Sequence, residues 1–155
     1  MGLPEFGPVP GLRTESGFQV ATDVTRRKVL IIEDEPAIRN VLFVLIAGLG
    51  CEGDVAYTGQ QALSMMSRES FDAVLLDLRC NNVGAEEVVS QIKEIRPNLV
   101  GRVLVITGEV TDAQTIEMLD RYLLPHIPRS RLMSELWSRL QTILAANSSP
   151  KTANS

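Results

Sequence analysis

The chain has 155 residues, of which 45% are hydrophobic and 22% are charged, as is typical of one globular domain with short extensions. A net charge of −4 and a pI near 5.0 argue against broad electrostatic attraction to nucleic acid or to an anionic membrane. No segment reaches the roughly 18 apolar residues that a membrane span needs. The two cysteines, Cys51 and Cys80, lack metal-ligand spacing and are expected to be reduced thiols.

The two ends of the chain differ in composition from its middle. Residues 1–26 contain four glycines and three prolines without a period, and they predict a flexible N-terminal extension. Residues 147–155 are polar and predict a disordered tail. Between them, residues 27–146 are expected to form a single domain.

Short runs rich in Val, Ile and Leu alternate with helical patterns through this middle part. The runs predict parallel strands that are apolar on both faces, at residues 28–33, 54–57, 73–77, 102–107 and 122–124. The helical patterns between and after them lie at 36–49, 59–67, 85–95, 112–120 and 130–144. Five strand–helix units in succession predict an α/β fold, in which helices cover both faces of a parallel sheet.

Polar residues stand at the ends of three predicted strands. Glu33 and Asp34 end the first, Asp77 ends the third, and Thr107 ends the fourth. Ligands of open parallel sheets bind beyond the carboxyl ends of the strands, so these side chains are expected to share one crevice. Three carboxylates in one crevice repel one another unless a cation neutralises them. Oxygen ligands without histidine or cysteine favour Mg²⁺ over zinc, and the pattern therefore predicts a magnesium site.

A magnesium ion with open coordination positions attracts phosphate, and a carboxylate beside it can form an acyl phosphate. The acidic pair thus follows the first predicted strand, Asp77 the third and Thr107 the fourth. Together with the stretches FDAVLLDL (71–78) and RVLVITGE (102–109), this order resembles the receiver domain of two-component response regulators. The resemblance covers roughly residues 27–145.

The resemblance implies a flavodoxin-like five-stranded parallel sheet in the order 2-1-3-4-5 and a role in signal transduction rather than metabolic catalysis. It implies that Asp77 accepts phosphate from a histidine kinase or a phosphotransfer protein, with Mg²⁺ as cofactor. Glu33, Asp34 and Asp77 correspond to the metal ligands, together with the backbone carbonyl of Arg79. Thr107 corresponds to the switch hydroxyl. The phosphorelay chemistry and the absence of a secretory signal predict a cytoplasmic phosphoprotein.

The chain departs from the family pattern at three places. Glu33 stands where Asp is usual, and residues 80–84 replace the usual Met-Pro-Gly loop. The family ends its fifth strand with a Lys-Pro pair, whereas residues 122–131 read YLLPHIPRSR and contain no lysine. His126 is the candidate substitute for that lysine. Arg129 is an alternative cation that could reach the site, but it is expected to belong to the start of the last helix. Without the lysine, phosphorylation is expected to shift the conformation of the domain only weakly.

These departures leave a second function open. A degenerate receiver would act as an interaction or dimerisation module without phosphoryl transfer. A homodimer through the face formed by residues 112–120, 122–124 and 130–144 is the candidate assembly. A haloacid-dehalogenase-type phosphatase is disfavoured, because that chemistry needs an acid two residues after the nucleophile and Arg79 stands there.

Overall fold

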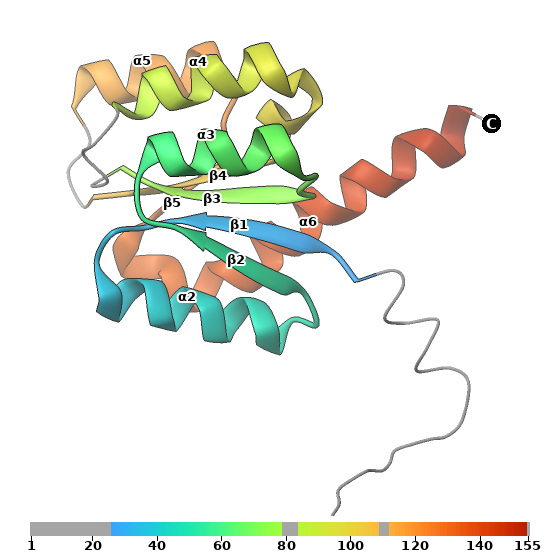
Figure 1. Ribbon diagram of the computed structural model, residues 1–155, viewed down its shortest axis with the longest axis horizontal. Coiled ribbons are helices and arrows are strands. Elements are labelled where there is room, and N and C mark those ends of the chain that lie inside the picture. Colours follow the sequence, from blue (N-terminus) through green and yellow to red (C-terminus); the bar gives the residue numbers. More distant parts are fainter. Residues whose placement is uncertain (1–25, 79–83, 109–111, 155) are drawn as a thin grey trace, which may run out of the picture.

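The computed structural model describes residues 26–78, 84–108 and 112–154. Its centre is a five-stranded parallel sheet in the order β2-β1-β3-β4-β5 (Figure 1). The strands are β1 (Lys28–Ile32), β2 (Glu52–Ala56), β3 (Ala73–Asp77), β4 (Val103–Thr107) and β5 (His126–Pro128). This topology confirms the predicted fold class and strand order.

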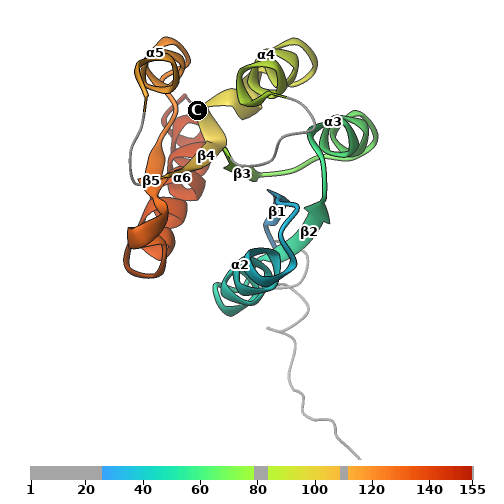
Figure 2. The same cartoon turned by 90° about the vertical axis from the view of Figure 1, so that its left-hand side faces the viewer.

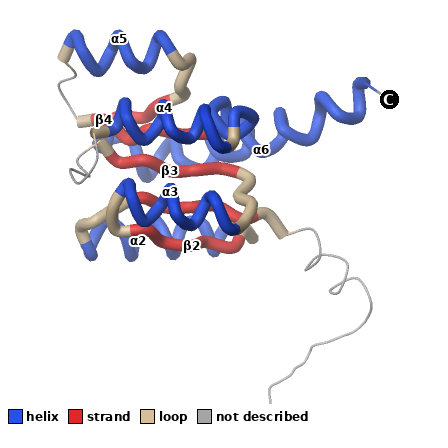
Figure 3. Tube along the Cα trace, turned by 45° about the horizontal axis from the view of Figure 1, so that its top comes forward, coloured by secondary structure: helices blue, strands red, loops and turns tan. Residues whose placement is uncertain are grey.

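Helices cover both faces of the sheet (Figures 1 and 2). Each of them follows a strand, as the tube view shows (Figure 3). They are α2 (Pro36–Gly48), α3 (Gly59–Arg68), α4 (Ala85–Ile95), α5 (Ala113–Arg121) and α6 (Leu132–Asn154), with short 3₁₀ segments η2 (Pro97–Arg102) and η3 (Arg129–Arg131). None of the helices in these ranges is long and apolar enough to cross a membrane.

The apolar residues form one core on each side of the sheet. Helices α3, α4 and α5 pack on one face, where Met66, Ile92 and Leu119 are buried. Helices α2 and α6 pack on the other face, where Ile46 and Leu140 are buried. Strands β3 and β4 are buried along their whole length, because helices cover them from both sides.

Local sequence signals explain where several helices begin. Pro36 occupies the first turn of α2, where its missing N–H costs nothing. The Thr58 side chain accepts a hydrogen bond of 3.0 Å from the backbone N–H of Gln61 and caps α3. Asp112 caps α5 in the same way, through a 2.7 Å bond from the N–H of Thr115. These caps fix the residues at which α3 and α5 begin after the preceding strands.

The predicted position of the fifth strand, residues 122–124, is wrong. Tyr122 ends α5, and Leu123 adopts a left-handed conformation with φ 54° that closes the turn. The strand lies at His126–Pro128 instead, where only Ile127 is fully buried. Pro125 just before the strand and Pro128 within it make the strand hard to predict from the sequence. A proline is tolerated here because β5 is an edge strand.

The two predicted extensions have different outcomes. The sequence predicts a disordered tail over residues 147–155, but the backbone of α6 is helical through Asn154. Once a helix is nucleated, each further residue adds a hydrogen bond at little cost, and Ala145 and Ala146 favour this continuation. The helix passes Pro150, although proline disfavours a helix interior. Of the predicted N-terminal extension, residues 1–25 lie outside the described residues.

Candidate functional site

Three polar residues are buried at the carboxyl edge of the sheet. Glu33 follows β1, Asp77 ends β3 and Thr107 ends β4, and in the described part of the chain these are the buried polar or charged residues. The register pairs Ile32 with Leu76 and Asp77 with Ile106, so the three residues lie at one level of adjacent strands. The structure therefore brings Glu33, Asp77 and Thr107 to one edge of the sheet.

Arg129 binds the carboxylate of Asp77. Its Nη2 donates to Oδ1 at 2.7 Å and to Oδ2 at 2.6 Å. Arg129 reaches this position because Pro128, the last residue of β5, pairs with Thr107 at the end of β4. The Asp77 side chain is fully buried and that of Arg129 is 23% exposed. The guanidinium thus neutralises Asp77 from the edge of the sheet.

Glu33 is fully buried beside this ion pair. Its Oε2 accepts a 3.1 Å hydrogen bond from the backbone N–H of Glu35, while Oε1 is buried without a hydrogen-bond partner. Burial and the neighbouring carboxyl of Asp77 raise the pKa of Glu33 to about 8, although Glu35 N–H and the charge of Arg129 oppose the shift. The surroundings of Glu33 therefore favour its neutral form.

These contacts show how the acidic cluster is balanced among the protein's own groups. The charge of Arg129 offsets that of Asp77, and burial favours the neutral form of Glu33. The Nη1 of Arg129 is also buried without a partner, next to a crevice that contains the unpartnered Oε1 of Glu33. Two unsatisfied and complementary polar groups at one edge indicate that the site is built to receive something polar.

The predicted metal ligands do not all converge. Asp34 is exposed, and no cluster of three or more acidic, His or Cys side chains suited to a metal occurs among the described residues. Arg79 and residues 80–83 of the loop after Asp77 lie outside the described part. The unpartnered Oε1 of Glu33 and the adjacent acids are hard oxygen donors that suit Mg²⁺ in kind. Both oxygens of Asp77, however, are engaged by Arg129.

The side chains of Thr107 and His126 lie within hydrogen-bond distance of backbone oxygens. The hydroxyl of Thr107 donates to the backbone oxygen of Ile127 at 3.4 Å. His126 is exposed at the start of β5, and its Nδ1 lies 3.2 Å from the backbone oxygen of Leu124. In the structure, the cation that contacts Asp77 is Arg129.

Arg129 lies beside Asp77, and not within the last helix as expected, because the fifth strand begins four residues later than the predicted 122–124. A strand at 122–124 puts residues 125 and 126 at the carboxyl edge, whereas a strand at 126–128 puts Arg129 there. The sequence contains one electrostatic signal that points to Arg129. Buried acids at strand ends need a cation, and Arg129 is the first Lys or Arg after the predicted fifth strand at 122–124.

Comparison with known proteins identifies the class that this fold and site define. The model of the response regulator receiver domain matches residues 29–140. The chain is 25% identical over 117 residues to response regulator MprA of Mycobacterium avium (strain 104), a match that covers 76% of this chain and 50% of that protein. The chain thus spans about half the length of this relative.

Solved structures show the same fold. The response regulator protein TrrA of Thermotoga maritima in complex with Mg(2+)-BeF has a TM-score of 0.65 at 23% identity, covering 76% of this chain and 99% of TrrA. A CheY-like receiver domain protein from Methanospirillum hungatei JF-1 has a TM-score of 0.66 at 18% identity, covering 77% and 97%.

The chain belongs to the response regulator receiver domain family. It is a signalling domain of the two-component type and not a member of a catalytic enzyme family. Membership implies a histidine kinase as the partner class.

Proposed function

We propose that this receiver accepts a phosphoryl group on Asp77 from a histidine kinase or a phosphotransfer protein in the cytoplasm. The observation that carries the proposal is the buried Asp77 carboxylate at the end of β3, held at 2.6–2.7 Å by one guanidinium nitrogen. A buried carboxylate beside a cation and a second acid is the arrangement that acyl-phosphate chemistry needs. Glu33, beside it, has an oxygen with no other partner.

In the proposed reaction, a carboxylate oxygen of Asp77 attacks the phosphorus of a phosphohistidine. A P–O bond forms, the P–N bond breaks, and its electron pair goes to the imidazole nitrogen of the donor. Arg129 is within reach of the reacting oxygens, so its guanidinium can bind phosphoryl oxygens as they replace those of the carboxylate. Rotation of the Thr107 hydroxyl away from Ile127 supplies a further hydrogen bond to the phosphoryl group.

Glu33, Asp34 and Asp77 are the residues that would hold Mg²⁺, and the carbonyl of Arg79 is proposed as a further ligand. When bound, the ion would supply positive charge that neutralises the transferring phosphoryl group. Arg129 must then share Asp77 or withdraw from it, because it occupies both carboxylate oxygens.

The test is to incubate the protein with Mg²⁺ and a small-molecule phosphodonor and to locate the base-labile modification by borohydride trapping and mass analysis. We expect modification at Asp77 alone, and none in the Asp77→Asn variant. Asp120→Asn is the matched control, because Asp120 is exposed on α5 and should leave labelling unchanged. Labelling at Asp54 or Asp72 instead would refute the assignment.

A second function is favoured by one observation. Arg129 already neutralises Asp77 in the unmodified protein, so the site is balanced without phosphate or metal. A degenerate receiver would use this state permanently, as an interaction or dimerisation module. Absence of labelling at Asp77, from the small donor and from kinase-bound phosphohistidine, would favour this second function.

The face formed by α5, β5 and α6 is the proposed homodimer surface in either case. Exposed apolar side chains lie along it, at Ile116, Leu123 and Met133. Large apolar side chains gathered on one exposed face commonly mark an interaction surface. Sedimentation of Ile116→Asp against the parent protein tests it, since a charge at that position should abolish any dimer.

A further inference from the structure

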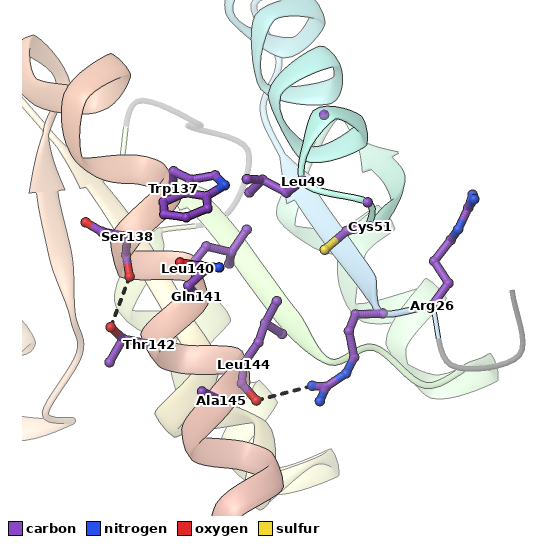
Figure 4. A pocket seen from close by; sticks show the side chains of 13 residues that line it. Arg26, Leu49, Cys51, Trp137, Ser138, Leu140, Gln141, Thr142, Leu144 and Ala145 are labelled. Carbon is purple, nitrogen blue, oxygen red and sulfur yellow. Dashed lines mark hydrogen bonds between the residues drawn. The ribbon is translucent and has the colours of Figure 1, made fainter. Parts of the chain in front are cut away.

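A groove of about 890 Å³ lies between the end of α2 and helix α6, away from the Asp77 site (Figure 4). Leu49 and Cys51 line one wall and Trp137, Leu140 and Leu144 line the other (Figure 4). Arg26 and Arg27 stand at one end. Ser138, Gln141 and Thr142 also line it, so the groove is mixed in character, with an apolar strip along its walls and basic side chains where the described chain begins.

The groove has room for an occupant. Trp137, the single tryptophan of the chain, is 56% exposed on its rim. A side chain added at Gly48 would meet no atom within 4 Å. An exposed tryptophan beside an open apolar groove is the kind of surface that a bound segment usually covers.

The chain itself enters at the basic end of the groove. The Nη1 of Arg27 donates to the backbone oxygen of Leu144 at 3.2 Å, which ties the residues before β1 to α6. From Ala145 to Trp137 the helix extends about 12 Å. Eight extended residues reach roughly 26 Å, so the segment 18–25 is long enough to pass Trp137 from Arg26.

The sequence of that segment matches the groove. Residues 18–25 read FQVATDVT, in which Phe18, Val20 and Val24 share one side of an extended chain with Thr22 between them, and Asp23 precedes the two arginines by three and four residues. An extended segment with this alternation presents one apolar side. We propose that residues 18–25 bind in the groove as an extended segment, with Phe18 or Val20 against Trp137 and Asp23 beside Arg26 and Arg27.

The short connection favours this occupant over a second copy of the chain. A short tether gives an effective concentration on the order of millimolar, well above the concentration of free protein in solution. Bound in this way, the segment closes the face formed by α2 and α6 to other proteins.

Trp137 fluorescence in the full chain tests the proposal. We expect acrylamide to quench the parent protein weakly and the double variant Phe18→Ser, Val20→Ser strongly. Loss of two buried apolar side chains should lower the ratio of bound to released segment roughly tenfold or more. Phe6→Ser is the matched control and should behave like the parent. Equal quenching of parent and double variant would overturn the proposal, and so would protection of Trp137 that disappears on dilution.

Proteolysis provides an independent measurement. Gly48→Phe should fill the groove, release the segment and accelerate cleavage at Asp23 by an Asp-specific protease. Gly101→Phe is the control, because that glycine also has no atom within 4 Å of an added Cβ and lies in η2 outside the groove. Equal cleavage rates at Asp23 in both variants would contradict the proposal.

Discussion

At the residue scale, the contact between Arg129 and Asp77 sets the properties of the site. Removing Arg129 leaves a fully buried carboxylate without its cation. Mg²⁺ and Arg129 would bind the same two oxygens of Asp77. In the parent protein a metal must therefore displace a hydrogen bond between charged groups. Such a bond is worth about 1.5–3 kcal/mol.

Arg129→Ala should accordingly bind Mg²⁺ roughly tenfold or more tightly than the parent, because about 1.4 kcal/mol corresponds to a factor of ten. Calorimetric titration with Mg²⁺ measures this. The control is Arg131→Ala, since Arg131 is exposed and pairs with Glu135 at the surface. Unchanged or weaker Mg²⁺ binding by Arg129→Ala would show that the guanidinium and the metal do not compete.

Glu33 makes the stability of the metal-free protein depend on pH. Its pKa is about 8 in the folded state against an ordinary 4.5, so between these values the folded protein holds a proton that the unfolded chain has released. The contribution of Glu33 to the free energy of unfolding should therefore be fully present below about pH 4.5 and should fall as the pH rises towards 8. Urea unfolding in EDTA between pH 5 and pH 8 measures the fall.

Glu33→Gln is the matched variant, because it keeps the shape of the side chain and cannot release a proton. Its stability should be nearly independent of pH over the same range. A decline as steep as that of the parent would assign the effect to another group.

At the element scale, the turn between α5 and β5 contains a strained residue. Leu123 has a φ of 54°, a conformation that costs a non-glycine residue about 1–2 kcal/mol, and its side chain is 82% exposed. Leu123→Gly should therefore raise the free energy of unfolding by about 1 kcal/mol. Urea denaturation is the measurement. Leu123→Ala keeps the strain and should give no such gain, and a loss of stability in the glycine variant would contradict the argument.

At the scale of the whole molecule, Arg129 connects the acidic site to the edge strand β5 and to helix α6. It lies in η3, directly between β5 and α6, and its side chain ends on Asp77. A ligand that takes the place of the carboxylate oxygens either displaces the guanidinium of Arg129 or holds it in place. The backbone of η3 moves or stays with it. Weak switching is expected from the lack of a lysine, and Arg129 is a second cation that could transmit the change.

Beryllofluoride with Mg²⁺ should therefore shift the amide signals of Thr107 and of residues 126–132 in the parent protein. In Arg129→Ala the shifts should stay confined to the residues around Asp77. Heteronuclear NMR spectra of the two proteins, free and bound, measure this difference. The same shifts over 126–132 in both proteins would show that the signal travels by another route.

Much of this protein is determined by local sequence patterns. Alternating strand and helix periods predict the parallel sheet, and the bounds of β3 and α4 agree with the structure at both ends. Glu33, Asp77 and Thr107 were found because each directly follows or ends an apolar strand, and parallel topology brings such residues to one edge.

Tertiary structure decided what the local patterns do not contain. The fifth strand is an edge strand with prolines and one fully buried residue, so its position depends on pairing with β4 rather than on its own composition. That pairing brings Arg129 to Asp77, 52 residues away in the chain. Burial of one Glu33 oxygen, and hence its raised pKa, likewise depends on neighbours from other strands. Charge balance in this site is a property of the assembled sheet, because electrostatic partners are chosen by distance in space and not by spacing in the sequence.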